Sequence, residues 1–297
     1  KYRLLREAVV ARELGVLEVP EGARDGALLR VHTPEWVERV STGRLERNEV
    51  RRIGFPWSPE LVERSRRSVG GTIAAARAAL RDGASANLAG GTHHAFADRG
   101  EGFCVFNDVA VAIRAHQATG RLRRAAVLDL DVHQGNGTAA IFRGDDQVFT
   151  ASVHGAANFP FRKEPGDLDL PLPDGTADGP FLDAVARAIR GVVEVGRPEL
   201  VFYVAGADPF EGDRLGRMAV TREGLAHRNE MVVDAMRQAG IPLAMVMGGG
   251  YAHRVEDTVA IHLDAVEAVA SLATPRPGGS VEASPSPPPG VPGRASA

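Results

Sequence analysis

AAVLDLDVHQGNG, residues 125–137, is the stretch that decides the fold. A short apolar run containing the β-branched Val127 leads into a glycine-rich turn, which is typical of a buried parallel strand. Because side chains alternate along a strand, Asp129, Asp131 and His133 are predicted to share one face at its carboxyl end. A single aspartate there would be interpreted as a cap for the next helix. Three ligand-type residues so close together indicate instead a metal site, at the edge where open α/β sheets bind ligands.

On either side of this strand the chain repeats the order strand, loop, helix. Further strands are predicted to end near residues 91, 153, 206 and 248, and a long loop spans residues 155–179. One helix is predicted to begin at Pro59, with Ser58 as N-cap, and to run to residue 80 with a break at Gly70-Gly71. Others are predicted over residues 107–119, 181–195 and 221–238, and up to residue 273. This order predicts a single α/β domain with a central, mostly parallel sheet flanked by helices on both faces.

Composition limits the classes of protein that the chain can belong to. With 297 residues, 44% of them hydrophobic, it can bury a sizeable core, and a formal net charge of −3 predicts no nucleic-acid partner. Its one cysteine, Cys104, excludes an internal disulfide. No apolar run reaches the ~18 residues of a membrane span and no signal peptide is visible, so a cytoplasmic protein without membrane contact is expected. We expect residues 1–273 to form the folded domain and the Pro/Ser/Gly-rich residues 274–297 a disordered tail.

Four motifs together resemble the histone deacetylase family: GGTHHAFADRGEGFCVFND at 90–108, DLDVHQGNGTAAIF at 129–142, GADPFEGDRLG at 206–216 and GGGY at 248–251. The resemblance covers roughly residues 1–270, and HQGNG and EGDRLG are most similar to its class IV and bacterial members. It implies the arginase/deacetylase fold, one zinc ion and hydrolysis of an amide on an acylated amine. Residues 1–273 would then be the catalytic domain.

The resemblance also assigns the metal ligands. It implies that Asp131, His133 and Asp213 hold the ion. Asp208 is the competing candidate in the same loop, but it matches a structural position of the family. Three protein ligands leave positions open for water and substrate, as a catalytic Zn²⁺ requires, and Fe²⁺ is a second choice. A K⁺ site, formed largely by backbone carbonyls, is implied at Asp129, Asp131, His133, Ser152 and Val153.

Two adjacent histidines follow a Gly-Gly strand end, where the backbone can come close to the metal. By resemblance His94 is the general base and His93 its electrostatic helper or proton donor, with Asp129 as the partner of His93. The partner of His94 is an aspartate in class I relatives and Asn136 here. Because an amide cannot hold an imidazolium as a carboxylate does, we expect His94 to be less basic than in those relatives.

The remaining predicted site residues bind or polarise the substrate. Tyr251 follows three glycines, Gly249 among them as a substrate-binding residue, and its phenol is predicted to donate to the developing oxyanion. By resemblance, Gly102, Phe103 and Phe159 match the walls of the substrate tunnel. Arg3 resembles an arginine in the cavity beneath the metal.

These residues predict a zinc-dependent deacylase acting on an acylated lysine protein or peptide. The alternatives are an acetylpolyamine or other small-amine deacetylase and, less favoured, a non-catalytic scaffold that binds acyl-lysine. Residues 52–57 offer no carboxylate to grip a peptide backbone, so a long fatty-acyl chain is expected to be preferred to acetyl. A short tunnel closed by Phe103 and Phe159 would favour acetyl. The scarcity of lysine beside many arginines suggests a bacterial source, and the start at Lys1 suggests that upstream sequence is missing.

Overall fold

The sheet is the centre of the molecule. The structure is a computed structural model that describes residues 1–273. Six strands pair in parallel in the order β1-β6-β5-β2-β3-β4. The predicted α/β architecture with a parallel sheet between helices is therefore confirmed. The strands are β1 (Ala84–Asn87), β2 (Ala125–Asp129), β3 (Val148–Gly155), β4 (Leu168–Leu172), β5 (Leu200–Val204) and β6 (Leu243–Val246).

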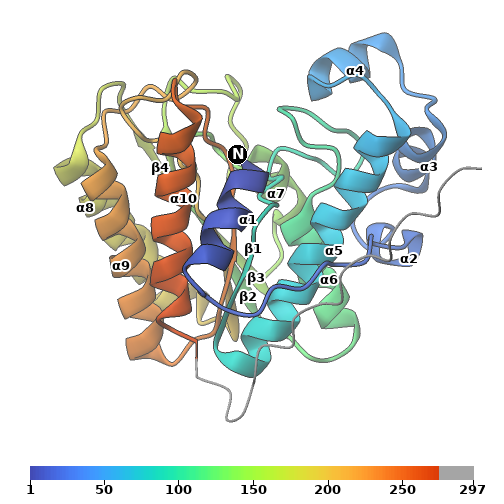
Figure 1. Cartoon of the computed structure of the whole chain (residues 1–297). Helices are drawn as coiled ribbons and strands as arrows, with labels where there is room; N and C mark the ends of the chain where they lie inside the picture. Colours follow the sequence, from blue (N-terminus) through green and yellow to red (C-terminus); the bar gives the residue numbers. More distant parts are fainter. Residues whose placement is uncertain (274–297) are drawn as a thin grey trace, which may run out of the picture.

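Alternation along β2 shows how the sheet is covered. Ala126 and Leu128 belong to a core shared with α8 (Asp178–Arg190), α9 (Arg222–Ala239), α10 (Val255–Ala270) and α1 (Tyr2–Ala11). Ala125 and Val127 belong to a second core shared with α5 (Pro59–Asp82) and α6 (Asp108–Ala118). Figure 1 shows these helices gathered on the two sides of the sheet. Since both faces are buried, β2 is a continuous apolar run.

Shorter helices complete the described part of the chain. Three of them, α2 (Asp25–Leu28), α3 (Pro34–Thr42) and α4 (Arg47–Ile53), pack with the start of α5 around the buried Trp36. The helix α7 (Asn136–Phe142) follows the β2 motif directly, and the π-helix η1 (Gly191–Gly196) continues α8. Within residues 1–273, no helix combines the length and the apolar character needed to cross a membrane.

The predicted break at Gly70-Gly71 is wrong, because α5 is continuous from Pro59 to Asp82. Both glycines are at points where other parts of the chain pack closely against α5. A Cβ at Gly70 would lie 1.9 Å from the carbonyl oxygen of Glu21, and one at Gly71 would lie 2.8 Å from the Asn87 side chain. The start of this helix follows the prediction, since the Ser58 hydroxyl accepts a hydrogen bond from Leu61 N–H.

Two further expectations need correction. The predicted loop at 155–179 contains the edge strand β4. The predicted strand end near residue 91 is too late, because β1 ends at Asn87 and the chain then loops into the histidine pair. The tail expected at 274–297 lies outside the described residues.

Candidate active site

A cluster of two aspartates and a histidine lies at the carboxyl end of the sheet. Asp131 and His133 follow β2, and Asp208 follows its neighbour β5. One possible ligand atom of each residue lies within 4.8 Å of those of the other two. Among residues 1–273 this is the group of side chains that could hold a metal ion. His133 Nδ1 is 3.0 Å from Asp131 Oδ1 and 3.1 Å from Asp208 Oδ2. Both carboxylates are fully buried.

Asp208 holds the third place in this group, and Asp213, the predicted third ligand, lies close enough to raise the pKa of Asp208; its role as a ligand stays a prediction. Asp213 Oδ1 accepts hydrogen bonds from the backbone N–H groups of Leu215 and Gly216. Its Oδ2 accepts one from Tyr251 N–H at 2.6 Å. Asp213 therefore shapes its own loop and ties it to the loop that carries Tyr251.

The cluster has the donor set of a divalent cation site. Burying two carboxylates is costly unless a positive charge accompanies them. Burial lowers the pKa of His133, but hydrogen bonds to Asp131 and Asp208 outweigh this and raise it to about 10. Burial and the nearby Asp131 raise the pKa of Asp208 to about 6. Without an ion the cluster therefore retains protons that Zn²⁺ or Fe²⁺ would replace.

The two predicted histidines lie beside the cluster, 4.1 Å apart between ring centroids. His93 Nδ1 lies 2.7 Å from Asp129 Oδ2, and His94 Nδ1 lies 2.8 Å from Asn136 Oδ1. Burial lowers the pKa of His93, but Asp129 and Asp131 outweigh it and raise it to about 9. Burial and the neighbouring His93 and His133 hold the pKa of His94 well below its usual range. The surroundings thus shift the pKa values of the two histidines in opposite directions.

A buried aspartate fixes the loop that carries these histidines. Asp108, at the start of α6, accepts hydrogen bonds from the Gly91 and Thr92 N–H groups and from the Thr92 hydroxyl. Gly91 has φ +77°, and a Cβ there would lie 2.5 Å from Gly248 N. The histidine loop and the loop after β6 therefore touch through their backbones. The role of Asp108 was not predicted from the sequence.

The glycine loop before Tyr251 supports the aspartates directly. Gly249 N–H donates to Asp131 Oδ2 at 2.7 Å, and a Cβ on Gly249 would lie 1.9 Å from Asp208 Oδ2. The structure thus places Gly249, predicted as substrate-binding, against the carboxylates of the cluster. Burial raises the pKa of the Tyr251 phenol, so it stays protonated and able to donate.

The predicted tunnel residues Gly102, Phe103 and Phe159 line one cavity. Its volume is about 2600 Å³, and its lining includes the histidine pair, Asp131 and Tyr251. The Phe159 ring lies 4.9 Å from that of His94, and the Phe103 ring lies 5.8 Å from that of Tyr251. A Cβ on Gly102 would lie 2.6 Å from the His94 ring, so only glycine permits this approach. Phe161 also lines this cavity, but it is 86% exposed.

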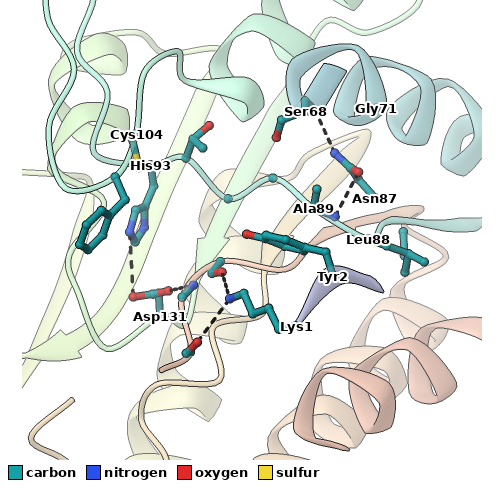
Figure 2. A pocket seen from close by; sticks show the side chains of 18 of the residues that line it. Lys1, Tyr2, Ser68, Gly71, Asn87, Leu88, Ala89, His93, Cys104 and Asp131 are labelled. Carbon is teal, nitrogen blue, oxygen red and sulfur yellow. Dashed lines mark hydrogen bonds and ion pairs between the residues drawn. The ribbon is translucent and has the colours of Figure 1, made fainter. Parts of the chain in front are cut away.

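The basic side chain that reaches the glycine loop before Tyr251 is Lys1, and not the predicted Arg3. Lys1 Nζ donates to the carbonyl oxygens of Gly248 and Gly250 at 3.3 and 3.5 Å. Figure 2 shows this side chain in the same pocket as His93 and Asp131. The interpretation of Arg3 is wrong, because Arg3 is exposed and pairs with Glu7. Of the residues expected to hold K⁺, Asp129 and Ser152 lie opposite each other in the pairing of β2 with β3. The K⁺ site itself stays a prediction.

One carboxylate of the site, Glu101, was not predicted from the sequence. Glu101 Oε1 accepts a hydrogen bond from Asn136 Nδ2 at 2.6 Å. Its position beside Gly102 and Phe103, two predicted tunnel residues, was the available signal. Its partner is more than thirty residues away in the chain, and no sequence pattern joins the two.

Known proteins are similar to this chain in sequence or in fold. Residues 2–266 match the family model for the histone deacetylase domain. An uncharacterized protein of Picosynechococcus sp. is 47% identical over 267 residues, which cover 88% of each chain. The crystal structure of a histone deacetylase homolog from Aquifex aeolicus has a TM-score of 0.78 and 25% identity, covering 90% of this chain and 77% of that one. An acetylpolyamine aminohydrolase from Burkholderia pseudomallei is similar in fold, with a TM-score of 0.73, 23% identity and coverage of 91% and 90%.

Proposed function

The chain belongs to the histone deacetylase family, and from that premise we propose that it is a zinc-dependent amidohydrolase that removes acyl groups from acylated lysine. The observation that carries the proposal is the meeting of the Asp131, His133 and Asp208 cluster with two buried histidines, one paired with a carboxylate and the other with an amide. Such a pairing suits hydrolysis, which needs one group to take a proton and another to stabilise negative charge.

Asp131, His133 and Asp208 would hold the ion, and Asp213, which the family motif implies, is the alternative third ligand. Three protein ligands leave positions open for water and for the substrate carbonyl. When bound, Zn²⁺ polarises the amide carbonyl and lowers the pKa of water. Fe²⁺ suits the same two oxygens and one nitrogen, so the donor set alone does not choose between the ions.

The surrounding side chains carry the proton transfers. His94 takes the proton of the attacking water and delivers it to the leaving amine as the amide C–N bond breaks. His93, held protonated by Asp129 at 2.7 Å, stabilises the negative charge that develops. The Tyr251 hydroxyl donates to the carbonyl oxygen as it becomes anionic. The products are a carboxylate and a free amine.

The cavity favours a long acyl group. Phe103 and Phe159 flank the alkyl chain of the lysine at the mouth. Beyond the cluster the lining continues to Tyr2, Asn87 and Leu88 (Figure 2). Each additional buried methylene contributes about 0.8 kcal/mol. Since residues 52–57 offer no carboxylate to a peptide backbone, we propose that recognition depends mainly on the acyl group, in the manner that the class IV motifs imply.

A substrate panel tests this proposal. Matched acetyl-, octanoyl- and myristoyl-lysine peptides and an acetylated polyamine are assayed with and without a chelator. We expect kcat/KM to rise from acetyl to the longer chains and all hydrolysis to stop on chelation. A steady fall with chain length would leave an acetyl-specific enzyme, and a preference for the polyamine would identify a small-amine deacetylase. If the metal-loaded chain hydrolyses none of them, the catalytic proposal fails and a scaffold that binds acyl-lysine becomes the better account.

A further inference from the structure

Three polar side chains link the catalytic base to the rim of the tunnel. His94 Nδ1 lies 2.8 Å from Asn136 Oδ1, and Asn136 Nδ2 lies 2.6 Å from Glu101 Oε1. His94 and Asn136 are 4% and 2% exposed, and the Glu101 side chain is 15% exposed. Water therefore has little access to compete for these hydrogen bonds.

Only one placement of the hydrogen atoms satisfies the hydrogen-bonding capacities of Glu101, Asn136 and His94. The Glu101 carboxylate can only accept, so the NH₂ end of the Asn136 amide must face it. The oxygen end then faces His94 and also can only accept, so the His94 hydrogen lies on Nδ1. A neutral imidazole protonated at Nδ1 carries its lone pair on Nε2.

We propose that Glu101 is a positioning residue, which orients the Asn136 amide and thereby holds His94 in the tautomer whose Nε2 can accept a proton. This inference rests on the proposed function, in which His94 is the base. An amide has two ends of nearly equal shape, and only the neighbours decide which end faces the histidine. Turned by 180°, Asn136 would donate to Nδ1 and favour the tautomer with hydrogen on Nε2, which cannot accept a proton there.

The neighbouring histidine shows why the amide needs such help. The partner of His93 is Asp129, whose two oxygens both accept, so no rotation of the carboxylate presents a donor. The backbone around Glu101 is fixed independently of its side chain. Cys104 N–H donates to the Glu101 carbonyl at 2.9 Å, and Gly102 N–H donates to the Arg52 carbonyl at 3.1 Å. Substitutions of the Glu101 side chain should therefore leave the loop in place.

A double-mutant cycle of Glu101 and Asn136 tests whether Glu101 acts by orienting the Asn136 amide or only by stabilising the structure. Glu101→Leu is expected to lower kcat by about tenfold or more, the size of one hydrogen bond to a charged group, with KM and metal content unchanged. In the Asn136→Asp background, Glu101→Leu is expected to leave kcat unchanged or raise it. A carboxylate at residue 136 accepts with either oxygen, and its repulsion with Glu101 is removed. Equal losses in both backgrounds would overturn the proposal.

Asp98→Asn is the matched control. It removes a nearby carboxylate that pairs with Arg99 at 3.0 Å and is 63% exposed. We expect wild-type kcat. A loss equal to that of Glu101→Leu would mean that negative charge near the rim, and not orientation of the amide, sustains activity.

A second readout does not depend on turnover. The ¹⁵N chemical shifts of the His94 ring report the tautomer in the purified protein at neutral pH. We expect hydrogen on Nδ1 in the wild type and a mixture of tautomers in Glu101→Leu. Glu101→Gln, which keeps an accepting oxygen without the charge, should fall between the two. An unchanged tautomer in both variants would overturn the inference, and because this result is independent of hydrolysis, it is distinguishable from a failure of the proposed function.

Discussion

Replacing Tyr251 by phenylalanine isolates the contribution of one hydroxyl group. The ring can keep its place 5.8 Å from the Phe103 ring, with Lys1 Nζ 5.4 Å from its centroid. The backbone is held separately, since Tyr251 N–H donates to Asp213 and its carbonyl accepts from Arg214 Nε at 2.9 Å. The expected change is therefore confined to the lost donor.

The size of the loss follows from what the hydroxyl donates to. Because the pKa of Tyr251 is raised by burial, the phenol remains a donor throughout the usual assay range. Removing one donor to a developing oxyanion costs roughly 2.7–4 kcal/mol, which is about 10²–10³ in kcat. KM should change little, because the oxyanion is absent from the ground state.

Steady-state kinetics on the preferred acyl-lysine peptide measure both parameters. Tyr2→Phe is the matched control, since it removes another phenol hydroxyl from the lining of the same cavity, and it should retain wild-type kcat. Two results would refute the reasoning about Tyr251→Phe. One is wild-type turnover, and the other is a raised KM at unchanged kcat, which would assign the phenol to substrate binding.

Three further predictions concern the base, the glycine loop and a buried histidine. His94→Ala removes the general base and should lower kcat at least as far as Tyr251→Phe does, and a smaller loss would assign the base elsewhere. Gly249→Ala places a methyl group 1.9 Å from Asp208 Oδ2 and should weaken metal binding by about tenfold or more, as titration with the ion would show. His32 is buried and its Nε2 accepts from Asn107 N–H, and burial lowers its pKa from 6.5 to about 4. The unfolded chain thus binds more protons in this range, so the free energy of unfolding should fall by about 3 kcal/mol as pH drops from 6.5 to 4. Urea unfolding of His32→Gln should show a shallower fall than the wild type, and equal slopes would contradict the linkage.

The features that the sequence predicted correctly are periodic or local. Alternation placed Asp131 and His133 together after β2, and the Ser58-Pro59 signal placed the start of α5. The strand β4 was not predicted because it is short and contains Pro171. Proline is tolerated at the edge of a sheet, which is where β4 lies.

The features that the sequence could not supply depend on contacts between distant residues. Asp208 and Asp213 lie in one loop, and only the three-dimensional structure shows that Asp208 lies against His133 and that Asp213 accepts from backbone N–H groups. The glycine pair in α5 looked like a helix break, because the approach of Glu21 to Gly70 cannot be seen in a local pattern. The link between Glu101 and Asn136 is of the same kind.

Metal stoichiometry in matched variants tests the central claim most directly. The wild type, Asp208→Ala and Asp213→Ala are purified, loaded with Zn²⁺ and analysed for bound metal and for hydrolysis of an acyl-lysine peptide. We expect one ion per chain and hydrolysis in the wild type, loss of both in Asp208→Ala, and retention of the ion in Asp213→Ala. Full metal binding and activity in Asp208→Ala, with loss of the ion in Asp213→Ala, would contradict the site described here.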